Sequence, residues 1–150
     1  MAELGLKWRK TKAKGGRMKD IAWSKILSVG VDEIDDDHRR LIAIFNELNQ
    51  AVSSGASAEY RAATLDELLK CTVWHFSHEE RLMLKYDYPA RAAHKAAHAE
   101  LVEAALALQA KLAQADQAVA NDEIIFLDRW LTEHILTVDQ HLGSFLAQVA

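Results

Sequence analysis

The residues in this sequence that offer the most chemistry are its histidines, of which the 150-residue chain has seven. Five of them fall on apolar faces of segments with helical periodicity, together with one glutamate and one aspartate. A single histidine on such a face is usually a core residue with its own partner. Burying this many polar groups unpaired would cost several kcal/mol at minimum, whereas a buried metal centre satisfies all of them. The candidate metal ligands are His38, His75, Glu79, His94, His98, His134 and Asp139.

The spacing of these residues supports a shared metal site. His94 and His98 are four residues apart, so their rings stand one above the other on a helix and can hold one ion. His75 and Glu79 have the same spacing. Seven ligands are too many for one six-coordinate ion but fit two ions with two bridging carboxylates. Imidazole and carboxylate ligands suit iron, manganese or zinc.

One spacing does not fit an ideal helix. His134 and Asp139 are five residues apart, which places them roughly 140° apart around an α-helix. The two side chains converge if the helix contains a π-bulge at this point. Otherwise Asp139 must reach around the helix, or it is a plain surface residue.

Four helices are expected to position the ligands, because Ala, Leu, Glu and Lys dominate and the chain has one proline and six glycines. Asp35 is expected to cap the first helix and Asn121-Asp122 the last, while Pro89 ends the second. Short links favour an all-α fold, an antiparallel up-down-up-down four-helix bundle. The predicted helices span residues 36–53, 58–86, 90–114 and 122–148.

An extended N-terminal arm is expected ahead of the first helix, over residues 21–35, because this stretch has no clean helical period. The chain therefore divides into a basic tail, residues 1–20, which we expect to be disordered, and a bundle domain, residues 21–150. The apolar side chains of the arm that are available to pack on the bundle are Trp23, Ile26, Val29, Val31 and Ile34.

Charge is distributed unevenly between these two parts. The tail carries a net charge of +5, and the rest of the chain carries −9. An acidic body is a poor binder of nucleic-acid phosphates, although a basic tail is also compatible with an arm that binds nucleic acid or a membrane surface. The tail lacks the apolar region of a secretory signal, and Met18 offers a second possible start. We expect a cytoplasmic protein that inserts into no membrane, since no run of about 18 apolar residues exists to span one. One acidic domain with no long apolar outer face favours a monomer.

The motifs IDDDHRRL (34–41), HFSHEE (75–80), HKAAH (94–98) and WLTEHILTVD (130–139) occur in this order. Together they form the pattern H…HxxxE…HxxxH…HxxxxD across four expected helices. This pattern resembles the hemerythrins, specifically the single-domain bacteriohemerythrins, over about residues 21–146. The family pattern includes the five-residue step, so the resemblance implies that Asp139 is a ligand.

The resemblance also implies a non-haem di-iron centre that binds O₂ reversibly. One iron would take His94, His98 and His134. The other would take His38 and His75 and keep an open position. Glu79 and Asp139 would bridge the two irons together with a solvent-derived oxo or hydroxo group.

Reversible binding of this kind needs a dry pocket, because water or an outside proton would release superoxide or peroxide and leave an inactive diferric state. His78 and His141 match no ligand position and are expected at the surface, with support of a metal ligand from behind as the alternative. Cys71 is expected to pack in the core, with a redox role or a contribution to the polarity of the pocket as the alternative. The expected O₂-pocket wall consists of Leu41, Ile42, Phe76, Trp130 and Leu131.

The implied function is oxygen storage, or delivery to an oxygen-requiring enzyme, by a protein that is not itself an enzyme. One alternative is an oxygen or redox sensor that acts through a separate partner. Another is a di-iron oxidase or an iron-handling protein. Bundle oxidases typically use Glu-x-x-His twice, and this sequence contains no Glu-x-x-His, because the residues three before each histidine are Asp35, Thr72, His75, Arg91, Lys95, Leu131 and Val138.

Overall fold

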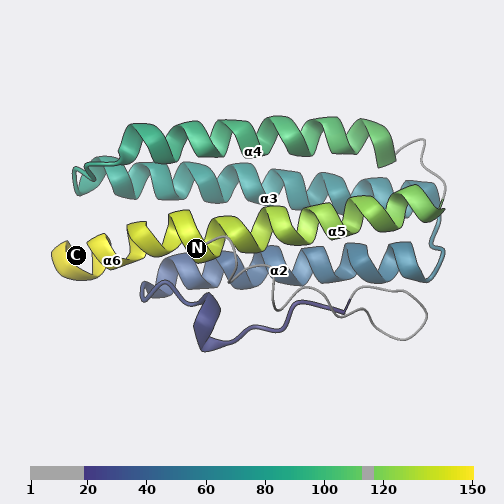
Figure 1. Ribbon diagram of the computed structural model, residues 1–150, viewed down its shortest axis with the longest axis horizontal. Coiled ribbons are helices and arrows are strands. Elements are labelled where there is room, and N and C mark those ends of the chain that lie inside the picture. Colours follow the sequence, from purple (N-terminus) through teal and green to yellow (C-terminus); the bar gives the residue numbers. More distant parts are fainter. Residues whose placement is uncertain (1–18, 113–116) are drawn as a thin grey trace.

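The computed structural model describes residues 19–112 and 117–150, and the elements in these ranges are all helical. The chain forms four long helical rods, which are α2, α3, α4 and the continuous run of α5, η2 and α6. The rods lie side by side, and consecutive rods run antiparallel (Figure 1). Each rod packs on the next along the chain, and the last packs on the first, so the predicted four-helix bundle is confirmed. The elements are η1 (Lys25–Leu27), α2 (Asp32–Ser53), α3 (Ala58–Lys85), α4 (Arg91–Leu112), α5 (Gln117–His134), the π-helical η2 (Ile135–Asp139) and α6 (Gln140–Val149).

The first long helix begins earlier than the sequence suggested. α2 starts at Asp32 rather than at residue 36, and Asp35 lies in its first turn instead of capping it. Acidic side chains in the first turn are favourable beside the positive end of the helix dipole, so the acidic run is helical from its start. The Asp35 carboxylate accepts hydrogen bonds from the Val29 N–H (2.8 Å) and the Ser28 hydroxyl (2.5 Å). It therefore joins the preceding arm to the helix.

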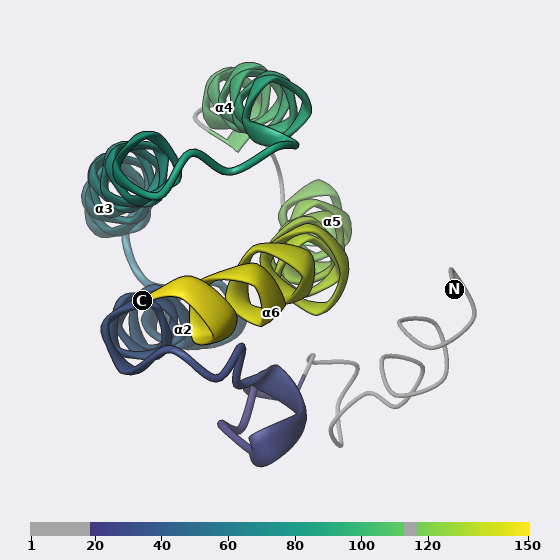
Figure 2. The ribbon, with the colours of Figure 1, turned by 90° about the vertical axis from the view of Figure 1, so that its left-hand side faces the viewer.

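The last rod differs from the expectation at its beginning and agrees with it in the middle. α5 starts at Gln117, so Asn121 and Asp122 lie inside the helix and do not cap it. The sequence just before this pair contains alanines, which have the highest helix propensity, and this favours the earlier start of the helix. The suspected π-bulge is present as η2, and α6 continues from it, inclined toward α2 (Figure 2).

The N-terminal arm packs on the bundle through a partly different set of residues from the one predicted. Val29 and Ile34 are buried, but Ile26 is 65% exposed, and Ile21 and Leu27 are buried instead. The short turn η1 rotates Leu27 inward and Ile26 outward. The Gln140 side chain donates to the carbonyl of Ser28 at 2.7 Å, so the arm is tied to the residue after η2.

Two apolar clusters fill the interior on either side of a polar layer. The larger cluster reaches from α2 residues such as Phe45 to α5 residues such as Leu127. The smaller one joins the arm and the starts and ends of the helices through Val29, Ile34, Leu82, Met83, Leu142 and Leu146. On α2 and α3 the candidate ligands His38, His75 and Glu79 lie between residues of the two clusters.

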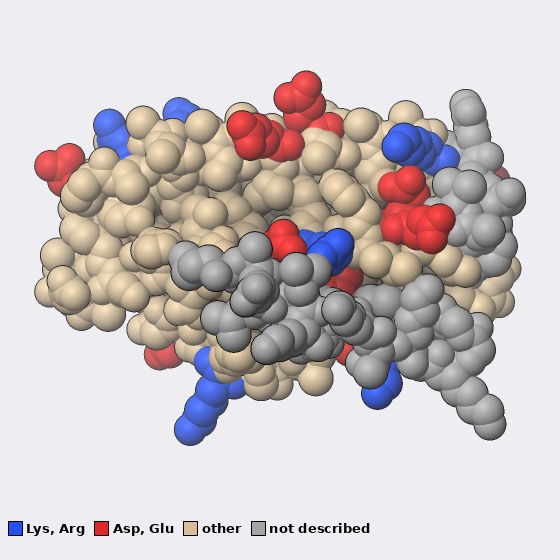
Figure 3. Space-filling view, in the orientation of Figure 1, with Lys and Arg blue, Asp and Glu red and all other residues tan. Residues whose placement is uncertain are grey.

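Among the described residues, no helix is long and apolar enough to span a membrane. On the face drawn in Figure 3, basic and acidic side chains of the described part are interspersed. The basic tail falls outside the described residues except for Lys19 and Asp20. Asp20 accepts hydrogen bonds from the side chains of Asn49 (3.0 Å) and Gln50 (2.7 Å) on α2.

Candidate metal centre

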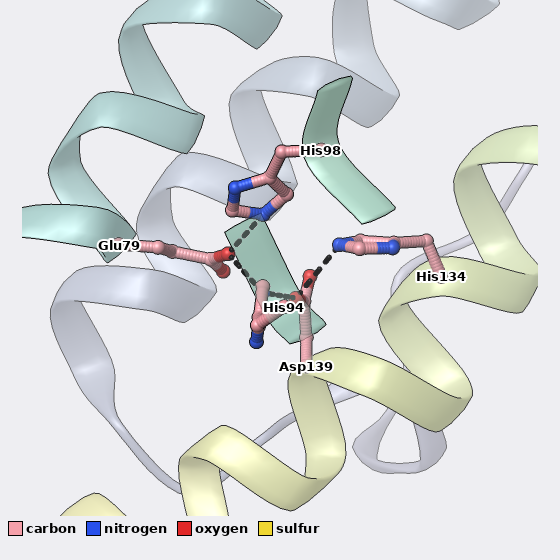
Figure 4. A group of neighbouring side chains, drawn as sticks. All are labelled: Glu79, His94, His98, His134 and Asp139. Carbon is pink, nitrogen blue, oxygen red and sulfur yellow. Dashed lines mark hydrogen bonds and ion pairs between the residues drawn. The ribbon is translucent and has the colours of Figure 1, made fainter. Parts of the chain in front are cut away.

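The seven predicted ligand residues meet in the middle of the bundle, and every helix rod contributes at least one of them. His38 comes from α2, a pair from each of α3 and α4, His134 from the end of α5 and Asp139 from the end of η2. All seven are at most 8% exposed. The π turn makes His134 and Asp139 face each other. Figure 4 shows this pair together with Glu79, His94 and His98.

Three of the histidines form one half of the cluster, called the three-His half below. Glu79 Oε1 lies 3.1 Å from His94 Nε2 and 3.0 Å from His98 Nε2. Asp139 Oδ1 lies 3.0 Å from His134 Nε2 and 3.2 Å from His94 Nε2. These three histidines, Glu79 and Asp139 each offer one ligand atom, and the five atoms all lie within 4.8 Å of one another. Atoms this close together can surround one ion.

The other two histidines form the two-His half. His38 Nε2 and His75 Nε2 are 3.1 Å apart. Glu79 Oε2 lies 3.0 Å from His75 Nε2, and Asp139 Oδ2 lies 2.9 Å from His38 Nε2. Each of the two carboxylates thus presents one oxygen to the three-His half and the other oxygen to the two-His half.

The hydrogen bonding inside the cluster shows that its atoms suit a cation. Among the described residues, Glu79 Oε2, His134 Nε2 and both Asp139 oxygens are buried without a hydrogen bond of acceptable geometry, although an imidazole nitrogen or carboxylate oxygen lies about 3 Å away. Their lone pairs converge on common points rather than on one another. Buried polar atoms of this kind are costly unless something binds them, and a metal ion bound between them would do so.

The buried carboxylates and imidazoles of the cluster shift one another's pKa values. Burial disfavours the charged imidazole of His75, but the Glu79 and Asp37 carboxylates outweigh it and raise the pKa to about 10. His94 behaves in the same way, and Asp139 and Glu79 raise its pKa to about 9. Burial likewise opposes ionisation of Glu79, yet the surrounding imidazoles hold its pKa well below its usual range. Protons therefore occupy these imidazoles until a metal ion replaces them.

Carboxylates outside the cluster orient two of the rings. His75 Nδ1 lies 2.8 Å from Asp37 Oδ2, and His98 Nδ1 lies 2.9 Å from Glu80 Oε2. A proton shared with an outer carboxylate leaves the opposite nitrogen, Nε2, as the metal-binding atom. Sequence reasoning singled out neither carboxylate for this role.

His78 departs from the prediction. It is only 8% exposed rather than at the surface, and its Nδ1 lies 2.6 Å from Asp37 Oδ2. Its position three residues after His75 on α3 places both rings toward α2, and this spacing is the signal that was available in the sequence. His141 is exposed, as predicted, and Cys71 is partly buried against the larger apolar cluster, as predicted.

A cavity of about 10 Å³ lies beside the cluster. This is about the smallest void that can hold one water molecule, so the cavity is too small for an organic substrate. Phe76 stacks on the His98 ring with centroids 3.8 Å apart, and Thr72 directs its hydroxyl to the Leu68 carbonyl rather than into the cavity. The lining residues are His38, Leu41, Thr72, His75, Phe76, Leu101, Trp130, Leu131, His134, Ile135 and Asp139.

Four of the five expected wall residues line this cavity, and Ile42 does not. Ile42 is buried in the larger apolar cluster instead. Viewed along the axis of α2, the side chain of His38 projects between those of Leu41 and Ile42. The cavity lies on the Leu41 side. Sequence reasoning did not assign Thr72, Leu101 and Ile135 to the wall, although each lies within one helical turn of a predicted ligand.

Comparison with known proteins gives a consistent result. The family described as "Hemerythrin HHE cation binding domain" matches residues 29–146. The chain is 34% identical over 133 residues to a bacteriohemerythrin of Stenotrophomonas maltophilia, covering 83% of this chain and 86% of that protein. It is 34% identical over 124 residues to a hemerythrin-like protein of Naegleria gruberi, covering 83% and 92%. A crystal structure of wild-type hemerythrin superposes with a TM-score of 0.72 at 31% identity, covering 83% of this chain and 95% of that one.

Proposed function

This chain belongs to the hemerythrin family, and on that premise we propose that it binds O₂ reversibly at a non-haem di-iron centre. His94, His98 and His134 would hold one iron, and His38 and His75 the other. Glu79 and Asp139 would bridge the two irons. When bound, the pair of ferrous ions supplies the two electrons that O₂ takes up on binding and returns on release.

One observation supports two ions rather than one. Both carboxylates divide their oxygens between the two halves, with Oε1 of Glu79 and Oδ1 of Asp139 facing three imidazoles and the other oxygens facing two. A single ion would leave one oxygen of each buried carboxylate without a partner, at a cost of a few kcal/mol. Two ions use all four oxygens.

The two-His half is the side on which O₂ would bind, because this half offers one imidazole fewer and an ion held there would have fewer protein ligands. His38 and His75 border the small cavity, whose remaining wall is largely apolar. Leu41, Trp130 and Leu131 exclude water from it. The size of this cavity also supports a binding protein rather than an oxygenase, because it leaves no room for an organic substrate beside the two-His half.

We further propose that the bound O₂ serves storage, or delivery to an oxygen-consuming enzyme. The experiment is to load the reduced protein with Fe(II), measure iron by elemental analysis and follow O₂ uptake with an oxygen electrode. We expect two irons per chain and one O₂ taken up for each pair, recovered when the gas phase is exchanged for argon. Uptake that is not recovered, or uptake that continues beyond one O₂ per pair, would instead indicate an oxidase.

A further inference from the structure

A row of hydrogen-bonded side chains runs outward from His75, away from the candidate centre. His75 Nδ1 contacts Asp37 Oδ2 at 2.8 Å, the same oxygen contacts His78 Nδ1 at 2.6 Å, and His78 Nε2 contacts Glu33 Oε1 at 2.8 Å. The Asp37 and His78 side chains are each 10% exposed, whereas the Glu33 side chain is 56% exposed. The row therefore connects a buried ligand candidate with the protein surface.

We propose that Asp37 is a positioning residue for the two-His half, and that His78 holds Asp37 in place. This inference rests on the proposed di-iron function. Asp37 accepts a hydrogen bond from Nδ1–H of His75, so Nε2 of that ring points into the cluster, 3.0 Å from Glu79 Oε2 and 3.1 Å from His38 Nε2, where a metal ion would displace its proton. Without such an acceptor the ring is free to adopt the other tautomer, which places a proton on the metal-binding atom.

The geometry locks the ring from two helices. Asp37 lies on α2, and the two imidazoles that donate to it lie on α3, one turn apart. The Trp74 ring packs against His78 with centroids 5.5 Å apart, so His78 itself has little freedom to rotate. A carboxylate fixed by two charge-assisted hydrogen bonds keeps a ligand ring in one orientation before any ion arrives.

The other rings of the cluster are held less firmly. The Glu80 side chain, which contacts His98, is 28% exposed. Among the described residues it accepts a hydrogen bond from one imidazole, whereas Asp37 accepts from two. The Nδ1 atoms of His38 and His94 are buried without a hydrogen-bond partner among the described residues. Since the two-His half has only two imidazoles, the orientation of His75 matters more to its ion than the orientation of any one ring in the three-His half.

Replacement of the charged acceptor by a neutral amide, whose oxygen accepts more weakly, should therefore weaken binding at one of the two sites. Partners of this kind typically change metal affinity by about 10–100-fold. We expect Asp37→Asn to weaken the binding of one Zn(II) ion by about that factor and to leave the second ion nearly unaffected. The matched control is Asp36→Asn, which removes the same charge one residue away, from a side chain that is 72% exposed and paired with Arg39.

His78 provides a second test that does not touch Asp37. His78→Ala removes the donor that holds Asp37 and should weaken the same Zn(II) ion several-fold. His78→Gln retains an N–H donor and should restore most of the affinity. A role of His78 in packing alone predicts no such rescue by glutamine.

The experiment is a calorimetric titration of the metal-free full-length protein and these variants with Zn(II), with the imidazole N–H protons of the loaded protein followed by ¹⁵N NMR. The proposal predicts a His75 Nδ1–H that exchanges slowly with water in the wild type and rapidly in Asp37→Asn. Equal affinities and equal exchange rates in Asp37→Asn and Asp36→Asn would overturn the positioning role. A wild type that binds no pair of ions would instead refute the di-iron function, so the two failures are distinguishable.

Discussion

The two halves of the candidate centre share two carboxylates but are surrounded by different environments. The three imidazoles of the three-His half border open grooves of about 260, 430 and 540 Å³ along α4, in the order His94, His98 and His134. Alanines of α4, including Ala93, Ala97 and Ala99, line these grooves. The two-His half faces the small cavity of about 10 Å³, which His134 also lines, and is backed by Asp37 and His78.

This difference suggests two ways to hold an ion. The three-His half relies on the number of its imidazoles and tolerates loose packing on its outer side. The two-His half has fewer ligands and relies on ligands oriented in advance within a dry space. For the proposed di-iron centre, this division would help to retain both ions while leaving room for a gas at one of them.

The comparison predicts the largest effect for loss of an imidazole from the two-His half. His75→Ala leaves one imidazole for its ion, whereas His98→Ala leaves two for the other ion. Both variants should lose iron and melt at a lower temperature, because binding to a buried site contributes directly to folding, and His75→Ala should lose more. Elemental analysis and a thermal melt measure both effects.

His141→Ala is the control for these variants, because His141 is an exposed histidine outside the cluster. It should keep full iron content and the wild-type melting temperature. Full iron occupancy in His98→Ala, or a larger loss there than in His75→Ala, would contradict the assignment of the halves.

A smaller effect is expected from the cavity wall. Leu131→Asn keeps the side chain's size roughly constant and adds an amide that can hold water beside the two-His half. The amide can also donate a hydrogen bond to bound O₂, worth about 0.5–1.5 kcal/mol, but we expect the admitted water and its protons to dominate. The oxygenated protein should decay several-fold faster in air, measured by its absorption, with iron content unchanged.

Leu131→Met is the matched apolar control and should leave the lifetime near that of the wild type. An equal or longer lifetime in Leu131→Asn would show that Leu131 does not keep the cavity dry.

The pH dependence of the metal-free protein tests the electrostatics of both halves together. The pKa of His75 is raised to about 10 and that of His94 to about 9, from an ordinary value of 6.5. The folded metal-free protein thus binds more protons than the unfolded chain. This stabilisation is fully present below pH 6.5 and is lost as the pH rises through 9 to 10. The melting temperature of the metal-free protein should therefore fall over this range.

With Zn(II) bound, the same imidazoles carry no proton on the binding nitrogen, so this part of the pH dependence should disappear. Melting curves of the two forms across pH 7 to 10 provide the measurement. Parallel curves for the metal-free and Zn(II)-loaded protein would argue against metal binding at these histidines.

The smallest effect is expected from the basic tail. Deletion of residues 1–17 should leave iron content, O₂ binding and melting temperature unchanged within error, because this stretch has no apolar stripe to bury. Loss of iron on deletion would show that the tail contributes to one of the halves.

Periodicity along single helices was enough to predict the bundle and the inward positions of the candidate histidines and Glu79. The stripes that contain Phe45, Leu68 and Leu127 are buried as expected. The five-residue step from His134 to Asp139 left three possibilities open, and the structure has the π turn that one of them required. These features depend on neighbours within about one helical turn, which a sequence displays directly.

Features that depend on contacts between distant segments were not predictable in the same way. Asp37 and His78 are 41 residues apart, and nothing in either helix alone shows that they meet. The arm that contains the inward-facing Leu27 is likewise held by a distant residue, because Gln140 donates to the Ser28 carbonyl across 112 residues of sequence. Tertiary pairing, rather than local propensity, decided these positions.

The most direct test of the central claim is an optical spectrum of the reduced, iron-loaded protein taken before exposure to air, after exposure and again under argon. If the seven residues hold two irons that bind O₂ reversibly, a charge-transfer absorption should appear in air and disappear under argon over repeated cycles. An absorption that does not appear, or that persists under argon after the first exposure, would contradict reversible O₂ binding at this cluster.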